Sequence, residues 1–152
     1  MKTIAIVYNP KETNSRSLAE KLPCILPEHY QITLCPLENP DSIRSFFSTW
    51  QETLPHLILT INLAGFELRT TGNDAAYTKL PVNFIHYISK SPSHYREQLQ
   101  GLIDFTAKFI VTTPEAKTYL EKNYSNIYDI TLTTSLTDSL PPILEQLDWR
   151  LA

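Results

Sequence analysis

The stretch that decides the fold reads HLILTI at residues 56–61, NLAGFELRTTGNDAAY at residues 62–77 and VNFIHYI at residues 82–88. The two outer runs are apolar and rich in β-branched and aromatic residues, which is typical of buried strands. The middle run is polar and holds Gly65 and Gly72, two of the chain's three glycines. We therefore expect a loop at the carboxyl edge of a parallel sheet, where open α/β folds bind ligands.

Strand and helix patterns alternate along the rest of the chain. We predict strands over residues 3–8, 30–35, 57–61, 82–88, 108–111 and 127–132. Helices are predicted over residues 15–22, 41–50, 93–102 and 114–123, and from 136 or 139 to about 147. This alternation predicts one α/β domain over residues 1–152, a three-layer Rossmann-like domain with a mostly parallel central sheet. The prolines, including Pro23 and the Pro141-Pro142 pair, are expected at turns.

Composition and charge limit the partners that we expect. The chain has 152 residues, of which 42% are hydrophobic, enough to bury a core of its own. Its net charge is −3 and its 13 Lys and Arg residues are scattered, so we expect neither nucleic acid nor an anionic membrane as partner. The first apolar run, residues 4–8, is too short for a signal peptide or a membrane span. A cytoplasmic location with Cys24 and Cys35 reduced is the expectation.

The polar loop supplies most of the candidate ligand-binding residues. They are Asn62, Gly65, Glu67, Arg69, Asn73, Asp74 and Tyr77. A helix over residues 73–79 would place Asn73 and Tyr77 on one face, because residues four apart are neighbours on a helix. Two structural roles remain open for the same residues. As alternatives to ligand binding, Asn62 would cap a short helix, and Glu67 with Arg69 would form an exposed ion pair that contributes little to stability.

Three further candidates lie beside this loop in the predicted sheet. Alternation places His86 on the face of its strand that also carries Phe84 and Ile88. A single histidine in a strand is more often a buried residue with its hydrogen bonds satisfied than a general base. Thr113 and Glu115 flank Pro114 after another strand, in the order typical of a helix start.

The motifs of several common reactions and cofactors are missing from the sequence. There is no GxGxxG, no GxxxxGK[ST] and no GxSxG, and no His, Cys, Asp or Glu pair has the spacing of metal ligands. We therefore predict no catalytic residue, no metal and no cofactor. The turn NPKETNSRS at residues 9–17 resembles the phosphate loop of flavodoxins, but it has no glycine and Glu12 adds negative charge. Thr13 or Asn14 capping a helix is the favoured interpretation.

Two family resemblances involve the same region. The runs LILTINLAGFELRT at residues 57–70, AY at 76–77 and FIHYI at 84–88 resemble small single-domain proteins from clostridia-type bacteria, a group that implies no function. More distantly, this section and AKFIVTTPEAKTYLEKNY at residues 107–124 resemble the amino-terminal half of GT-B glycosyltransferases and spore-maturation-type relatives. The nucleotide-sugar site of those enzymes lies mainly in a carboxyl-terminal domain. The resemblance therefore implies an acceptor-side half that needs a separate donor-binding subunit.

Three functions follow as hypotheses. The first is a non-catalytic module that binds a small polar ligand or a protein partner at the carboxyl edge of the sheet. The alternative is the acceptor-side half of a split GT-B-type glycosyltransferase, and the least favoured is a flavodoxin-like FMN protein. A homo-oligomer formed through an apolar surface is compatible with all three.

Overall fold

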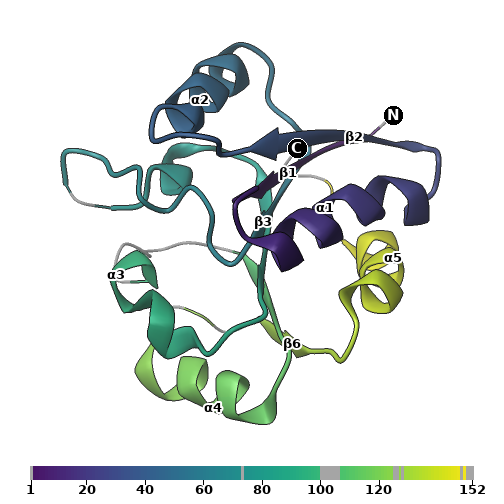
Figure 1. Ribbon diagram of the computed structural model, residues 1–152, viewed down its shortest axis with the longest axis vertical. Helices are drawn as coiled ribbons and strands as arrows, with labels where there is room; N and C mark the ends of the chain where they lie inside the picture. Colours follow the sequence, from purple (N-terminus) through teal and green to yellow (C-terminus); the bar gives the residue numbers. More distant parts are fainter. Residues whose placement is uncertain are drawn as a thin grey trace.

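The computed structural model describes residues 2–72, 74–99, 107–124, 127, 129–147 and 149, which form a parallel sheet of six strands between helices (Figure 1). The strands are β1 (Lys2–Tyr8), β2 (Tyr30–Pro36), β3 (Leu57–Ile61), β4 (Asn83–Ile88), β5 (Lys108–Val111) and β6 (Ile130–Leu132). The helices are α1 (Thr13–Ile25), α2 (Ser42–Glu52), α3 (Arg96–Leu99), α4 (Pro114–Asn123) and α5 (Leu136–Gln146). Two short 3₁₀ helices, η1 (Ala76–Lys79) and η2 (Pro92–Tyr95), complete the described part. The predicted three-layer Rossmann-like fold is confirmed.

The order of the strands is β2-β1-β3-β4-β5-β6. β1 lies between β2 and β3, so Ile4 has Ile32 beside it on one side and Leu57 on the other. The chain builds the sheet outward in one direction from β1 to β2 and in the opposite direction from β3 onward. This reversal places a topological switch point at the carboxyl ends of β1 and β3, as in flavodoxin-like doubly wound folds.

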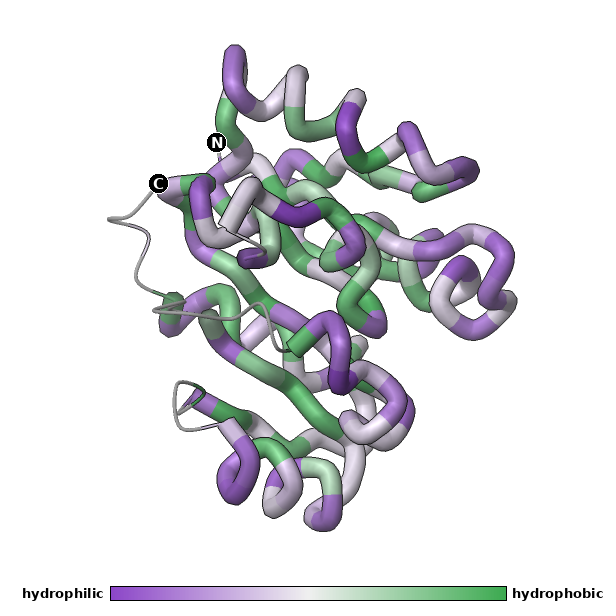
Figure 2. The backbone as a smooth tube through the Cα atoms, turned by 90° about the vertical axis from the view of Figure 1, so that its left-hand side faces the viewer, coloured by the Kyte–Doolittle hydropathy of each residue, from purple (hydrophilic) through white to green (hydrophobic). Residues whose placement is uncertain are grey.

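Alternating strand residues build one apolar layer on each face of the sheet. On one face, Ile6, Leu59 and Ile85 pack with α1 and α5. On the other face, Ile58 and Phe84 pack with α2, η1, η2, α3 and α4. Figure 2 shows the hydrophobic segments running through the middle of the molecule, with hydrophilic residues on the outer turns. Both faces of β3 are buried because the strand lies inside the sheet with helices on either side.

The prolines are the main error of the prediction. Pro23 lies inside α1, and Pro141 and Pro142 lie inside α5, rather than at turns. An interior proline costs a helix about 3 kcal/mol, because it lacks an N–H and crowds the preceding turn. In α5, Leu136, Leu140 and Leu144 recur every four residues and are all buried. Burial of a leucine contributes about 1.5–3 kcal/mol, so this apolar stripe offsets much of the cost of the prolines.

α1 is longer than the helix predicted over residues 15–22, and two elements in the second half of the chain also differ in extent from the predicted ones. β6 begins at Ile130 rather than at residue 127. The helix predicted over 93–102 is η2 followed by α3 as far as Leu99, and its last residues lie outside the described ones. In the described part of the chain, no helix is both long enough and apolar enough to cross a membrane.

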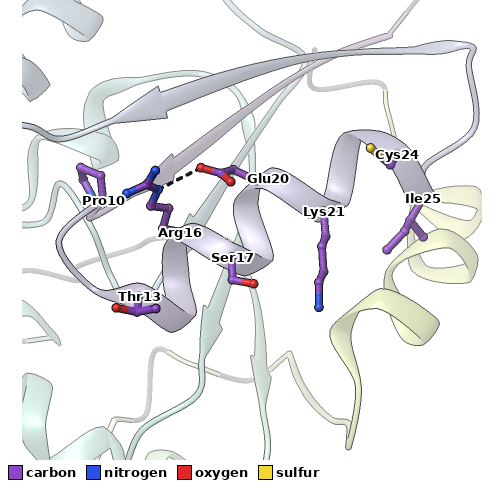
Figure 3. A pocket seen from close by; sticks show the side chains of 8 residues that line it. All are labelled: Pro10, Thr13, Arg16, Ser17, Glu20, Lys21, Cys24 and Ile25. Carbon is purple, nitrogen blue, oxygen red and sulfur yellow. Dashed lines mark hydrogen bonds and ion pairs between the residues drawn. The ribbon is translucent and has the colours of Figure 1, made fainter.

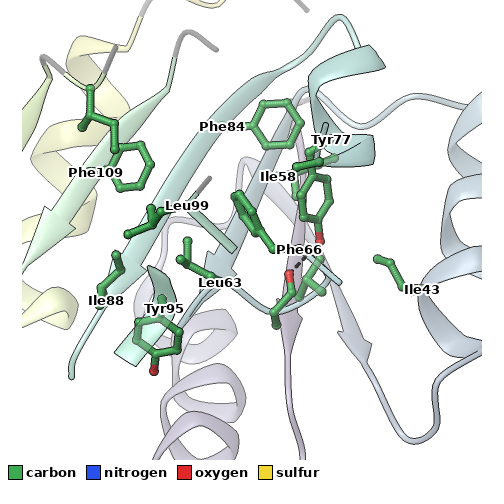
Figure 4. Close-up of a cluster of buried hydrophobic side chains, with 14 of the residues drawn as sticks. Ile43, Ile58, Leu63, Phe66, Tyr77, Phe84, Ile88, Tyr95, Leu99 and Phe109 are labelled. Atoms are coloured by element: carbon green, nitrogen blue, oxygen red, sulfur yellow. Dashed lines mark hydrogen bonds between the residues drawn. The ribbon is translucent and has the colours of Figure 1, made fainter. Parts of the chain in front are cut away.

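Gly65 is required by the packing between the turn after β3 and the core. Its φ is +90°, a conformation that favours glycine. A Cβ added to Gly65 would lie 2.1 Å from the Tyr77 hydroxyl oxygen and 2.9 Å from Ile43 Cδ1. The Tyr77 hydroxyl donates a hydrogen bond to the carbonyl of Ala64 at 2.8 Å, the dashed line in Figure 4. Any side chain at position 65 would displace this buried tyrosine.

We therefore expect Gly65→Ala to lower the free energy of unfolding by about 2–4 kcal/mol, through overpacking and the strained φ. Gly72→Ala is the matched control, because its nearest neighbours would lie 3.9 Å from the added Cβ. That control should stay within about 0.5 kcal/mol of the parent protein. Urea unfolding measures both variants, and equal losses would contradict the packing role of Gly65.

Candidate functional site

A cleft of about 400 Å³ opens at the switch point between β1 and β3. The loop after β1 contributes Asn9, Lys11 and Glu12 to its lining, and the loop after β3 contributes Asn62 and Glu67. The loop after β2, Ile43 of α2, Ile61 at the end of β3, and residues of η2 and α3 also line it. The volume lies within the range of small-molecule sites, and the position is where doubly wound folds bind their ligands.

Asn62 ties the loop after β3 to the loop after β4. Its Oδ1 accepts hydrogen bonds from the Ser89 backbone N–H at 2.8 Å and from the Ser89 hydroxyl at 3.2 Å. Its Nδ2 lies 3.0 Å from Ser89 Oγ and donates to Ser15 Oγ on α1 at 3.4 Å. The backbone N–H of Asn62 donates to the carbonyl of Tyr87 at 2.7 Å. One side chain thereby fixes three segments at the edge of the sheet.

The backbone of this turn is strained. Asn62 has φ +54° and Leu63 has φ +56°, both in the left-handed region. Asparagine tolerates this region better than most residues, whereas leucine pays about 1–2 kcal/mol. Leu63 is only 1% exposed, so burial of its side chain offsets that cost. Strained residues of this kind concentrate at functional sites, which supports the cleft as the working surface.

A chain of polar contacts runs along the same edge. Glu12 Oε1 accepts a hydrogen bond from Ser15 Oγ at 2.8 Å, and Glu12 Oε2 lies 3.5 Å from Lys90 Nζ. Beyond Asn62, the Thr112 hydroxyl donates to the carbonyl of Ser89 at 3.4 Å. The network connects the loops after β1, β3, β4 and β5. It holds the edge in one arrangement, which lowers the entropic cost of binding a ligand there.

The rest of the predicted loop turns away from the cleft. Arg69 donates hydrogen bonds from Nη2 to the carbonyls of Glu97 at 2.6 Å and Gln98 at 3.2 Å, so it holds the end of α3. Arg69 and Ala75 form an antiparallel bridge, and Thr70 N–H donates to the carbonyl of Asp74 at 2.8 Å. Figure 1 shows this hairpin projecting from the body of the protein. Asp74 is therefore not brought to Asn62, and Asn73 lies outside the described residues.

Tyr77 and His86 belong to the core instead of the surface of the cleft. Both side chains are 0% exposed. The helix predicted over 73–79 is the shorter η1, which directs Tyr77 inward against Phe66 and Phe84. His86 lies on the predicted face of β4, where its Nδ1 and the Thr60 hydroxyl share a hydrogen bond of 2.6 Å. Burial lowers the pKa of His86 to about 3, so its imidazole is neutral.

Thr113 and Glu115 form the predicted helix start. The Thr113 hydroxyl accepts a hydrogen bond from the Ala116 N–H at 3.1 Å, and Pro114 is the first residue of α4. Glu115 is exposed in the first turn of the helix, where its negative charge interacts favourably with the positive end of the helix dipole. Both residues follow β5 and are separate from the lining of the cleft. Their observed contacts give them a capping role.

Glu38, Tyr95 and Gln98 of the lining were not predicted from the sequence, and Glu12 was not expected to bind a ligand. Tyr95 is 8% exposed, and its hydroxyl has no hydrogen-bond partner among the described residues. The available signal was the position of residues 9–12 directly after the first strand, which the strand order makes part of the switch point. Nothing in the local pattern of η2 and α3 indicates that they reach the same cleft.

A second hollow of about 510 Å³ follows one side of α1 (Figure 3). Among the residues that the structure describes, its lining comes only from residues 10–25, and it includes the ion pair between Arg16 Nε and Glu20 Oε1, which lie 3.0 Å apart. Side chains from one exposed helix do not converge on a ligand as those of several loops do. In the described part of the chain, no group of three His, Cys, Asp or Glu residues is arranged to hold a metal ion.

Comparison of the chain with protein-family models, with curated proteins and with solved structures finds no match in any of the three.

Asn62 provides a test of the turn itself. Asn62→Gly removes the side-chain hydrogen bonds but tolerates the positive φ, so we expect a loss of about 1–2 kcal/mol in the free energy of unfolding. Asn62→Ala removes the same bonds and adds the left-handed strain, which should cost about 1 kcal/mol more. Urea unfolding of the two variants compares them. Equal stabilities would show that the strained backbone of the turn is not retained in solution.

His86 provides a test of pH dependence. An unfolded histidine binds a proton near pH 6.5, whereas native His86 stays neutral down to about pH 3. Its contribution to stability is complete above pH 6.5 and should fall by about 1.4 kcal/mol per pH unit below it. His86→Gln should flatten the dependence of the free energy of unfolding on pH between 6.5 and 4. In the parent protein, NMR of the His86 ring should show no titration from pH 8 to 5, and titration near 6.5 would refute its burial.

Proposed function

We propose that this chain is a non-catalytic binding module whose small polar ligand occupies the cleft at the carboxyl ends of β1 and β3. The observation that carries the proposal is the convergence of polar side chains from separate loops on one cleft at the switch point. The network of Glu12, Ser15, Asn62 and Ser89 supports it, because it holds those loops in place before a ligand arrives.

The flavodoxin-like strand order favours FMN as a second candidate. The loop after β1 argues against it. A bound phosphate would meet Glu12, whose carboxylate accepts from Ser15 and faces Lys90 at 3.5 Å. The loop 9–17 also has no glycine that would let its backbone approach a phosphate closely. FMN therefore enters the test as one compound of the panel.

A thermal-shift screen against nucleotides, nucleotide sugars, simple sugars, amines and FMN tests the proposal. A ligand at a hundred times its Kd stabilises the folded state by about 2.7 kcal/mol, which corresponds to a rise of roughly 5–10 °C in Tm for a domain of this size. We expect a stabilising compound whose effect is reduced in Glu67→Ala, at the cleft, and kept in Asp74→Ala, at the projecting hairpin.

The two variants also decide between parts of the polar loop. A ligand whose effect depends on Asp74 and not on Glu67 would move the site to the hairpin. No stabilising compound across the panel would contradict a small-molecule role. A protein partner at the same edge, which co-purification would identify, would then be the better account.

A further inference from the structure

The charge of the cleft indicates the class of ligand, provided that the proposed binding function holds. Among the described lining residues, the carboxylates of Glu12, Glu38 and Glu67 face only one ammonium group, that of Lys11. The nearby Lys90 lies 3.5 Å from Glu12, so three carboxylates and two ammonium groups leave one negative charge in excess. An anionic ligand would meet net repulsion here, whereas a cation would be attracted.

The floor of the cleft is apolar. Leu37, Ile43, Ile61 and Ala64 contribute to its lining, and Ile61 is 1% exposed. A fully hydrated inorganic ion would gain nothing from such a floor, and no three-carboxylate group is close enough to coordinate a metal among the described residues. A carbon frame that covers the floor would instead remove apolar surface from water.

Tyr95 adds an independent observation. Tyr95 lines the cleft and is only 8% exposed. Its hydroxyl has no hydrogen-bond partner within the described part of the chain. Figure 4 shows the hydroxyl at the far end of the ring, away from Leu63 and Leu99. Burial, together with the negative charge of Glu12, raises the pKa of Tyr95 to about 12. A buried polar group without a partner is costly, and a ligand that supplies the missing hydrogen bond removes that cost.

We propose that the cleft binds a small organic cation, an amine carried on an apolar carbon frame. Its ammonium group donates hydrogen bonds to the Tyr95 hydroxyl oxygen and to the carboxylate of Glu12, while the frame covers Ile43 and Ile61. An ammonium has three donors and no acceptor, which suits a site whose charged lining consists mainly of carboxylates. Glu67 at the rim favours the cation over its neutral analogue through charge.

Three probes that share one frame separate charge from shape. They are 2-phenylethylammonium, 2-phenylethanol and 3-phenylpropionate, each titrated into the ¹⁵N-labelled protein at pH 7 with NMR detection. We expect the ammonium to bind at least about tenfold tighter than the other two, a difference of 1.4 kcal/mol, with shifts at the amides of Asn39 and Ala64. The lining of α1 in Figure 3 should not respond, which distinguishes the two hollows.

Matched variants assign the contacts. Tyr95→Phe removes only the hydroxyl, so it should weaken binding of the ammonium about tenfold without lowering Tm, since that hydroxyl makes no hydrogen bond to any residue that the structure describes. Tyr87→Phe, on the opposite face of the sheet, is its control. Glu67→Gln should weaken the ammonium about threefold, and Glu121→Gln on the exposed side of α4 should not.

Each result has a separate meaning. If the alcohol or the carboxylate binds the cleft as tightly as the ammonium, the cation inference is wrong and the binding function stands. If Tyr95→Phe leaves the affinity for the ammonium unchanged, the assigned contact is wrong. If none of the three probes shifts the amides of the cleft at 20 mM, the cation inference is wrong, and the thermal-shift panel then decides separately whether the small-molecule function stands.

Discussion

The turn that follows β3 is the constraint on which the edge of this sheet depends. β3 ends at the edge of the sheet, yet Leu63 and Phe66, directly after it, are buried in the core. The left-handed backbone at Asn62 and Leu63 turns the chain back toward the core. Gly65 then leaves room for the Tyr77 hydroxyl, which satisfies the carbonyl of Ala64. The same turn leaves the Asn62 side chain at the surface, where it ties Ser89 and Ser15 together. Packing below the turn and polar contacts above it are therefore consequences of one backbone path.

The layers of the fold could be predicted because burial leaves a local pattern. β3 and β4 are buried on both faces, and runs such as residues 57–61 carry that information without reference to any other segment. The helix start at Thr113 is equally local, since the cap and the proline act on the next turn of backbone. The prolines of α5 were misjudged because a local penalty was weighed without the buried Leu136, Leu140 and Leu144, whose packing comes from the rest of the protein.

The candidate site could be predicted only in part, because a polar loop does not show which of its residues turn inward. Asn62 and Glu67 line the cleft, whereas Arg69 donates hydrogen bonds to the carbonyls of Glu97 and Gln98 at the end of α3, nearly thirty residues away. Tyr77 is a core residue because Gly65 makes space for its ring, a dependence between two positions that no periodicity records. Tyr95 and Gln98 reach the cleft only through the path of the chain after β4.

The strand order and the side chains at the carboxyl edge of the sheet indicate different classes of ligand, and the side chains are the more specific guide. Strand order sets where a ligand binds, since a switch point opens a crevice whatever residues surround it. Which ligand binds depends on the groups in the crevice. A phosphate site needs N–H groups and positive charge, yet the loop after β1 presents Glu12 beside a buried tyrosine hydroxyl. A fold that binds phosphate groups in flavodoxin-like proteins is thus compatible here with a cationic ligand, because the side chains rather than the topology set the sign of the charge in the cleft.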